Sequence, residues 1–368
     1  MAYTTIDDPT LYFETKLYTG NSSTNNITGL SFAPDWVWLK ERGGTGDHRF
    51  FDTVRGATND LVSNTNDGEA DSNTSLTAFN SDGFTLGNEG GVNNNGDTFV
   101  SWNWKAGDSN TSVSSSGSGN NAINACTHRA NTTAGFSIVK YTGLNSEISN
   151  GQKTKVTHGL GVKPDFLIIK NRDSSSNWIV TRGIDNDNHG VLNSTNAFSG
   201  SLFTGNQNQS DSTHFVVGNE AAVNANGDEF IAYVFAEKQG YSKFGSYTGN
   251  GASSPNEPFV YLGFKPAIIF YKRVSDGTNN WSVFDNKRDP HNEIEKQLNP
   301  NISNAEGTSS RGFFLSNGWK VGGGNSGSIN NSGSTYIYWA FAESPFVNSK
   351  GVPTTARWYE IFIDPIYV

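Results

Sequence analysis

Short runs of apolar residues alternate with clusters of glycine, asparagine and charged residues along most of the chain. The run WVWL at residues 36–39 follows a proline and ends in Lys-Glu-Arg, and the run FVSWNW at 99–104 follows the turn sequence NNNGD. Asn-Gly turns beside runs of β-branched and aromatic residues are typical of β-hairpins. The pattern therefore predicts short antiparallel strands joined by tight turns.

Four sequence landmarks recur three times in the same order. The first is Tyr-Thr-Gly, beginning at Tyr18, Tyr141 and Tyr247; the second is GLSFAPDWVWLKER at 29–42, GLGVKPDFLIIKNR at 159–172 and LGFKPAIIFYKR at 262–273. The third is HRFFDTVRG at 48–56, NWIVTRG at 177–183 and NWSVFDNKR at 280–288; the fourth occupies 81–107, 212–238 and 316–343. Each copy spans about a hundred residues, the size of a β-sandwich domain. The sequence predicts an all-β protein of three tandem antiparallel β-sandwich domains, jelly-roll-like, with Gly/Asn-rich turns.

The landmarks also set the expected boundaries. We place the first repeat at residues 1–107, the second at 135–240 and the third at 241–347. Residues 108–134 hold few bulky apolar side chains, which is typical of a flexible linker or an extended arm. Residues 348–368 form a tail with the apolar run WYEIFIDPIYV, which we expect to pack on the third repeat or on a neighbouring chain.

Trp36 and Trp38 raise the question of a ligand platform. The second copy has FLII and the third has IIFY where the first has WVWL, so bulk and apolarity persist while the aromatic positions change. A sugar-stacking platform needs aromatic rings at fixed places. We therefore expect Trp36 and Trp38 to lie in a buried strand.

Composition and charge narrow the class of partner. The chain has 368 residues, 34% hydrophobic and 17% charged, with 41 glycines and a net charge of -9. An acidic chain without a basic patch does not favour nucleic-acid binding. No apolar run approaches the ~18–20 residues of a membrane span, and the start MAYTTIDDPT lacks the features of a secretory signal. We expect no membrane insertion and synthesis in a cytosol; the single cysteine, Cys126, excludes an intrachain disulfide.

The sequence contains no complete metal-binding or phosphate-binding motif. The six histidines show no H-x-x-x-H spacing, and DNDNHG at 185–190 matches only the first half of a calcium loop because Asn196 stands where a bidentate glutamate belongs. A polar turn is the favoured interpretation. The stretch GGGNSG at 322–327 lacks the lysine of a phosphate loop.

The sequence also gives little support for a catalytic site. His48 and Asp52 suggest a dyad, but the other copies do not repeat it, and Glu89 and Glu220 match solvated turn residues. We expect Arg55, Arg182 and Arg288 to be structural, pairing with a carboxylate such as Asp52 or Asp285. No residue is predicted to be catalytic, cofactor-binding or metal-binding, and no cofactor is expected.

The landmarks carry a resemblance. Together with MAYTTIDDPTLYFETKLYTGN at 1–21, TAGFSIVKYTG at 133–143 and FAESPFVNSKGVPTTAR at 341–357, they resemble a repeat domain of marine tailed-bacteriophage (cyanophage-like) virion structural proteins of the tail-fibre type. The resemblance implies a non-enzymatic virion protein, assembled in the host cytoplasm, whose partners are other virion proteins, further copies of itself in a homo-oligomer such as a trimer, and host surface glycans. It transfers no site residue.

Two other functions stay open at this point. One is a capsid decoration or head-fibre protein, which the same resemblance and repeats allow. The other is a polysaccharide depolymerase, which the three-unit pattern disfavours because such enzymes usually carry a long β-helix. The tail-fibre or spike adhesin is the leading hypothesis. It rests on analogy, because a fold does not by itself determine a function.

Overall fold

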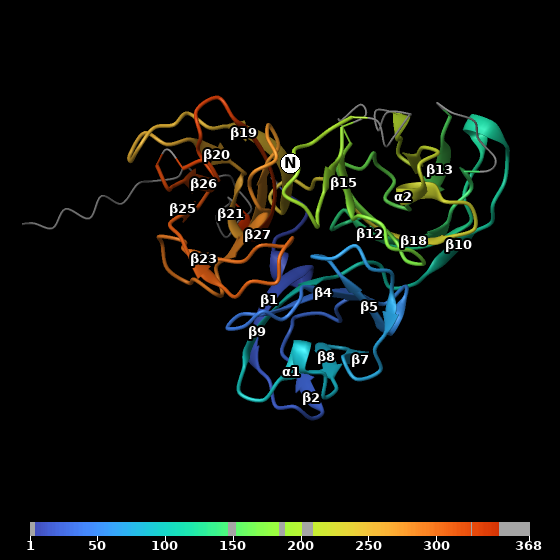
Figure 1. The fold of residues 1–368 in the computed structure, drawn as a ribbon, viewed down its shortest axis with the longest axis horizontal. Coiled ribbons are helices and arrows are strands. Elements are labelled where there is room, and N and C mark those ends of the chain that lie inside the picture. The colour runs from blue at the N-terminus through green and yellow to red at the C-terminus, as the bar shows by residue number, and fades with distance from the viewer. Residues whose placement is uncertain (1–3, 146–151, 184–187, 201–208, 325, 346–368) are drawn as a thin grey trace, which may run out of the picture.

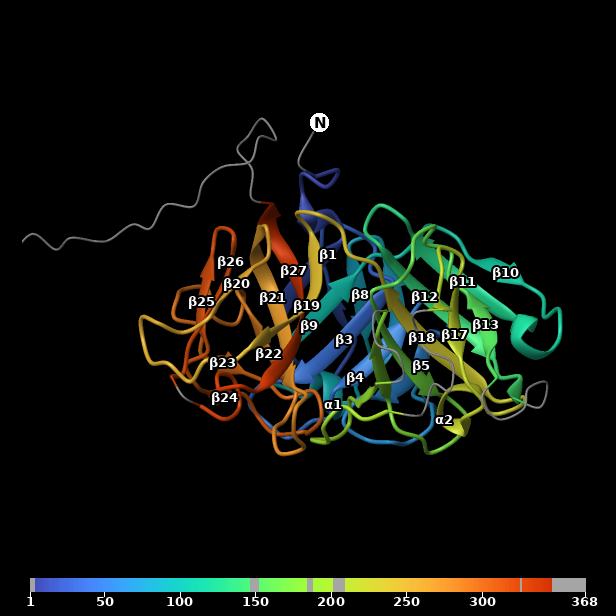
Figure 2. The same cartoon turned by 90° about the horizontal axis from the view of Figure 1, so that it is seen from above.

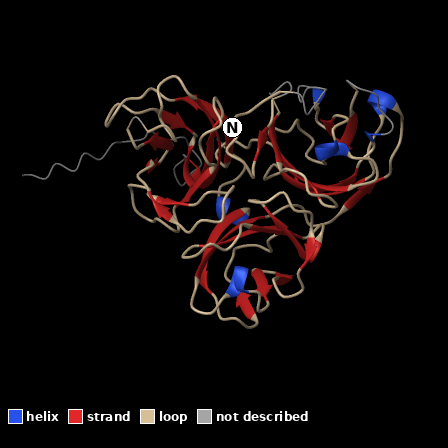
Figure 3. Cartoon of the chain, viewed as in Figure 1, coloured by secondary structure: helices blue, strands red, loops and turns tan. Residues whose placement is uncertain are grey.

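The computed structural model describes residues 4–145, 152–183, 188–200, 209–324 and 326–345. Its regular structure is almost entirely antiparallel β-sheet (Figure 3). The described part also contains two short α-helices, α1 (Gly90–Asn93) and α2 (Ala221–Asn224), and two 3-10 helices, η1 (Pro9–Leu11) and η2 (Gly119–Asn121). The predicted all-β class is confirmed. No helix among the described residues is long and apolar enough to cross a membrane.

Each repeat contains one large and one smaller sheet. In the first unit the large sheet has the order β1 (Phe13–Thr19), β9 (Thr98–Trp104), β3 (Trp36–Glu41), β4 (Arg49–Asp52), β5 (Gly56–Val62) and β6 (Ala70–Asp71), and the smaller has β2 (Asn25–Ile27), β8 (Gly83–Leu86) and β7 (Leu76–Asn80). In the second unit the large sheet has β10 (Thr111–Val113), β11 (Cys126–Asn131), β12 (Phe136–Thr142), β18 (Glu229–Phe235), β14 (Phe166–Asn171), β15 (Ile179–Arg182) and β16 (Gly190–Val191), and the smaller has β13 (Thr154–Thr157) and β17 (His214–Val217). In the third unit the large sheet has β19 (Ser242–Thr248), β27 (Thr335–Pro345), β21 (Phe264–Arg273) and β22 (Ser282–Asp285), the smaller has β20 (Phe259–Tyr261), β26 (Gly318–Val321) and β25 (Gly312–Leu315), and β23 (Lys296–Gln297) pairs with β24 (Gly307–Thr308). The order β1-β9-β3-β4 recurs as β12-β18-β14-β15 and as β19-β27-β21-β22, so the three repeats share one topology.

The central strand of each large sheet is buried on both faces. On β3, Trp36 and Trp38 point away from the smaller sheet, whereas Val37 and Leu39 pack against it. The same alternation occurs at Phe166 and Ile168 against Leu167 and Ile169, and at Ile268 and Phe270 against Ile269 and Tyr271. Since successive side chains on a strand point to opposite faces, each strand supplies two separate hydrophobic cores.

The large sheets of all three units face one another around a shared central core (Figure 1). Aromatic rings from different units meet there: Trp36 stacks on Tyr233 with centroids 4.3 Å apart, and Trp38 stacks on Phe270 at 5.1 Å. The three units are therefore consecutive in sequence but form one body with a common core.

The structure corrects one predicted boundary. Residues 108–134, expected to be a flexible linker or arm, contain β10 and β11, and β11 pairs with β12 along its whole length. The inward-facing side chains of β11 include Cys126 and His128 rather than large apolar residues, so the sequence pattern does not indicate a strand there. This segment belongs to the sheet of the second unit. The apolar tail at 348–368 lies outside the described residues.

The described ends of the chain lie at the same end of the body. Figure 2 places the N-terminal segment and the last residues of β27 together, and α1 and α2 at the opposite end. The loops beside the two helices therefore form a surface remote from both described termini.

Candidate functional site

The Tyr-Thr-Gly landmark ties the start of each unit to its last turn. The hydroxyls of Tyr18, Tyr141 and Tyr247 donate hydrogen bonds to the carbonyl oxygens of Val92 (2.8 Å), Val223 (2.5 Å) and Ile329 (2.8 Å). A Cβ on Gly20 would lie 2.1 Å from the carbonyl oxygen of Asn94, so only glycine fits there. The landmark is structural.

All three lysines of the second landmark are buried, and those of the second and third units also bind the backbone of the preceding unit. Lys170 Nζ donates to the carbonyl oxygens of Asn171 (2.6 Å) and Ser174 (3.2 Å), and to that of Asn66 in the first unit (3.3 Å). Lys272 Nζ donates to the carbonyl oxygen of Thr195 in the second unit at 2.8 Å. Burial lowers the pKa of both side chains, and that of Lys40 at the same place in the first unit, to about 8.

The arginines of the third landmark behave as predicted in two units. Arg55 Nε pairs with Asp52 Oδ2 and Arg288 Nε with Asp285 Oδ2, each at 2.5 Å with both side chains buried. Arg182 differs, because it pairs in register with Phe166, the place that Asp52 holds opposite Trp36. Its position on the strand is therefore that of the aspartates, not that of the other two arginines.

A carboxylate extends each of these buried pairs into the neighbouring unit. Glu69 accepts hydrogen bonds from Arg55 (2.9 Å) and from Arg172 of the second unit (2.5 Å). Glu306 of the third unit pairs in the same way with Arg288 and with Arg42 of the first unit. Burial opposes the ionisation of Glu69, but the hydrogen bond from Arg172 and the charge of Arg55 lower its pKa below the usual value.

His48 and Asp52, the candidate dyad, are buried and hydrogen-bonded to other residues. His48 Nδ1 accepts a hydrogen bond of 2.9 Å from Trp38 Nε1, and burial lowers its pKa well below the usual value. Asp52 is held by Arg55 and by the backbone N–H of Val54. The pair therefore lies inside the body, in contacts that do not form a dyad.

The structure also locates the paired tryptophans, the two turn glutamates and part of the candidate calcium loop. Trp36 and Trp38 are fully buried, as predicted. Glu89 and Glu220 precede α1 and α2 as N-cap residues, and the Glu89 carboxylate accepts from the backbone N–H of Gly91 at 3.4 Å. Residues 185–187 of the candidate calcium loop lie outside the described residues, and the part of the chain that is described holds no group of three His, Cys, Asp or Glu side chains suited to a metal ion.

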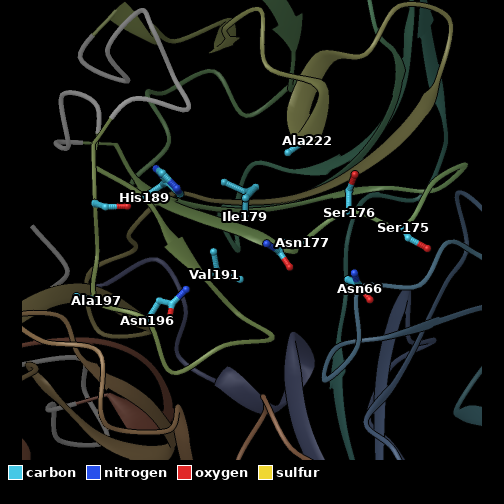
Figure 4. A pocket seen from close by; sticks show the side chains of 11 residues that line it. Asn66, Ser175, Ser176, Asn177, Ile179, His189, Val191, Asn196, Ala197 and Ala222 are labelled. Atoms are coloured by element: carbon cyan, nitrogen blue, oxygen red, sulfur yellow. The ribbon is translucent and has the colours of Figure 1, made fainter.

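A pocket of about 400 Å³ lies beside the seam between the first and second units (Figure 4). We call it the seam pocket; it is lined by Asn66, Ser175, Ser176, Asn177, Ile179, His189, Val191, Asn196, Ala197, Ser199 and Ala222. Figure 4 shows Ile179 and Val191 in the middle of the pocket, with Ala222 on one side and Asn196 on the other. Most polar groups in this lining are neutral amides and hydroxyls.

The buried lysines hold the rim of the seam pocket in place. Lys170 binds the backbone of Asn66 and of Ser174, next to the lining serines, while Lys272 binds the backbone of Thr195, next to Asn196. His189 and Ser199 are joined by two backbone hydrogen bonds of 2.9 and 3.0 Å. A pocket whose rim is fixed by such bonds binds a ligand with little loss of conformational entropy.

Neutral donors and acceptors over an aliphatic floor suit a hydroxyl-rich ligand. Each amide offers two N–H donors and one carbonyl acceptor, and each hydroxyl offers both functions. The volume lies within the ~300–1,000 Å³ range of small-molecule sites. Sequence reasoning missed this site, because its residues come from four separate segments and none belongs to a recognisable motif.

A known family profile matches most of the chain. The profile of a family described as "Domain of unknown function (DUF7483)" matches residues 8–345. The chain belongs to this family. The DUF7483 match covers all three units, so the family domain corresponds to the whole three-unit body. No curated protein and no solved structure matches the chain.

Proposed function

We propose that this DUF7483 protein is a non-enzymatic structural protein of a bacteriophage virion, a tail-fibre or spike adhesin that contacts host surface glycans. The observation that carries the proposal is the seam pocket, whose neutral amides and hydroxyls match the hydrogen-bonding groups of a sugar. Ala222 in its lining belongs to α2, at the end of the body remote from the described termini (Figure 2). That end is free to face a host surface if the termini join the protein to the virion.

The rigidity of the body supports an adhesive role. The central core and the buried ion pairs of Glu69 and Glu306 fix the three units to one another. A rigid body presents its binding surface in one orientation, and several copies on one particle convert weak contacts into high avidity. The net charge of -9 further favours neutral glycans over nucleic acid as the partner.

The binding experiment compares two variants of neighbouring residues in α2. Ala222→Phe places a ring in the seam pocket, whereas Ala221→Phe changes an exposed residue outside the lining. We expect Ala222→Phe to bind host cells and purified host surface polysaccharide at least tenfold more weakly than wild type, and Ala221→Phe to bind normally. Equal binding by the two variants would remove the support for the pocket.

Two further measurements test the location in the virion and the non-enzymatic role. Chemical cross-linking in purified particles should join this protein to tail proteins; cross-links to the major capsid protein would favour the decoration role instead. Incubation with host polysaccharide should release no oligosaccharide. Release by wild-type protein would contradict the non-enzymatic role.

A further inference from the structure

The outer face of the smaller sheet in the third unit carries exposed aromatic rings. Phe259 and Tyr261 on β20 are 45% and 52% exposed, and Phe313 on β25 is 37% exposed. Val260, between the first two, points into the core of the unit. Exposed aromatic clusters of this kind mark binding surfaces.

The other two units show that the fold does not require these rings. Val260 pairs with Trp319 as Ile27 pairs with Phe84 in the first unit and Val156 with Phe215 in the second. The inward residue stays aliphatic in all three. The outward residues on either side are Phe259 and Tyr261 in the third unit, but Asn26 and Thr28 in the first and Lys155 and Thr157 in the second. The aromatic face is therefore a feature of the third unit alone among the three equivalent strands.

Tyr261 also forms one wall of a cleft. The cleft measures about 300 Å³ and is lined by Glu237, Gln239, Gly240, Ser242, Lys243, Tyr261 and Leu262. Glu237 Oε1 lies 3.4 Å from Lys243 Nζ, and both side chains are about one-third exposed. The cleft thus combines an exposed ring, an amide, and a carboxylate beside an ammonium group.

We propose that this cleft is a second carbohydrate site, which takes a neutral pyranose ring stacked on Tyr261. The negative face of the aromatic ring attracts the polarised C–H groups on the apolar face of a sugar. Glu237 accepts from one hydroxyl while Lys243 or Gln239 donates to the next. Because the charges of Glu237 and Lys243 balance, the site suits a neutral sugar rather than an acidic one. The inference concerns a site separate from the seam pocket and stands without it.

Three probes test the site: methyl β-D-glucopyranoside, methyl β-D-galactopyranoside and methyl α-D-mannopyranoside. Each probe is titrated into the protein, and its binding is followed by saturation-transfer NMR. We expect wild-type protein to bind at least one of them and Tyr261→Ala to bind it about tenfold more weakly, a change of 1.4 kcal/mol. Tyr261→Phe should keep the binding because the ring remains. Thr28→Ala, at the equivalent place in the first unit, is the matched control and should bind as wild type does. The melting temperatures of all three variants should equal that of wild type, because both positions are exposed.

Three results would overturn the proposal: no probe binds wild-type protein, Tyr261→Ala binds as tightly as wild type, or Tyr261→Ala converts an oligomer to a smaller species in sedimentation. The last result would make the aromatic face a self-association surface. The same titration on Ala222→Phe protein isolates the cleft, because the seam pocket is then filled. Host-cell binding is measured separately, so failure of the adhesin role and failure of this site give different results.

Discussion

The hydroxyl of Tyr233 in the second unit donates a hydrogen bond of 2.9 Å to Asp52 Oδ2 in the first unit. Trp102 and Asp285 repeat this contact between the first and third units, where the indole Nε1 donates to the carboxylate at 3.0 Å. Burial raises the pKa of Tyr233 well above its usual value, so the hydroxyl keeps its proton and remains a donor. Each contact supplies a buried aspartate with a hydrogen-bond donor from another unit, so the packing of one unit depends on the presence of its neighbour.

Replacing Tyr233 with phenylalanine tests this link. The variant keeps the ring that stacks on Trp36 but removes the donor to a buried carboxylate. We expect Tyr233→Phe to lower the free energy of unfolding by about 1–3 kcal/mol, because a buried carboxylate loses one of its hydrogen-bond donors. Urea denaturation measures this change, with Tyr261→Phe as the exposed control. An unchanged midpoint in Tyr233→Phe would show that Arg55 and the backbone N–H of Val54 satisfy Asp52 without the tyrosine hydroxyl.

Glu69 gives a prediction with a pH dependence. Its folded pKa lies below the ordinary value of 4.5, so the stability that it contributes is present above pH 4.5 and is lost as the pH falls through the folded pKa. We expect Glu69→Gln to be less stable than wild type by about 1–3 kcal/mol at pH 7. The difference should shrink below pH 4.5, as measured by thermal unfolding between pH 3 and 7.

The control for Glu69 is Glu343→Gln. Glu343 pairs with Lys265 at 2.6 Å, but both side chains are about two-fifths exposed. An exposed pair contributes about 0–1 kcal/mol, so this variant should stay close to wild type. Equal losses in the two variants would contradict the view that Glu69 acts through its buried position between Arg55 and Arg172.

The sequence predicted the strands better than their arrangement. Trp36 and Val37 are both apolar, so the pattern predicts burial but not that the two side chains serve different cores. Burial on both faces removes the alternation that normally tells the inner face of a strand from the outer. The repeated landmarks predicted three like units, yet the shared central core depends on contacts between residues far apart in sequence, which no local pattern encodes.

The glycine of the Tyr-Thr-Gly landmark gives a steric prediction. A Cβ at Gly20 would meet the carbonyl oxygen of Asn94 at 2.1 Å, whereas a Cβ at Gly90 would meet nothing within 4 Å. We expect Gly20→Ala to lose about 2–4 kcal/mol because the backbone must move to relieve the clash. Gly90→Ala, in the same unit, should change stability by less than about 1 kcal/mol. Similar melting temperatures for the two variants would show that the turn at Asn94 shifts freely.

The candidate sites were beyond sequence reasoning for a different reason. The seam pocket joins Asn66 to Asn196, which lie 130 positions apart in a chain rich in asparagine and serine, so nothing marks either residue locally. Tyr261 is one of many aromatic residues, and its exposure follows only from the register of β20 against β26. By contrast, the pairing of Arg55 with Asp52 was predictable because the two residues are three positions apart in a repeated landmark.

Lys170 makes a pH-dependent contribution to stability. Its ammonium group is buried among three carbonyl oxygens, and burial lowers its pKa from 10.5 to about 8. Between those two pH values Lys170 binds more protons in the unfolded chain than in the folded protein, so the contribution of Lys170 to the free energy of unfolding rises with pH in that window. Lys170→Met lacks this proton equilibrium, whereas Lys40 and Lys272 are common to both proteins and cancel in the comparison. We expect the free energy of unfolding of wild type, relative to Lys170→Met, to increase by roughly 2–3 kcal/mol from pH 8 to 10.5. Urea denaturation at half-unit pH steps measures the difference, with Lys265→Met as the control for removal of a surface charge. A difference that stays flat across the window would mean that the amine of Lys170 is charged throughout and that its carbonyl partners fully replace water.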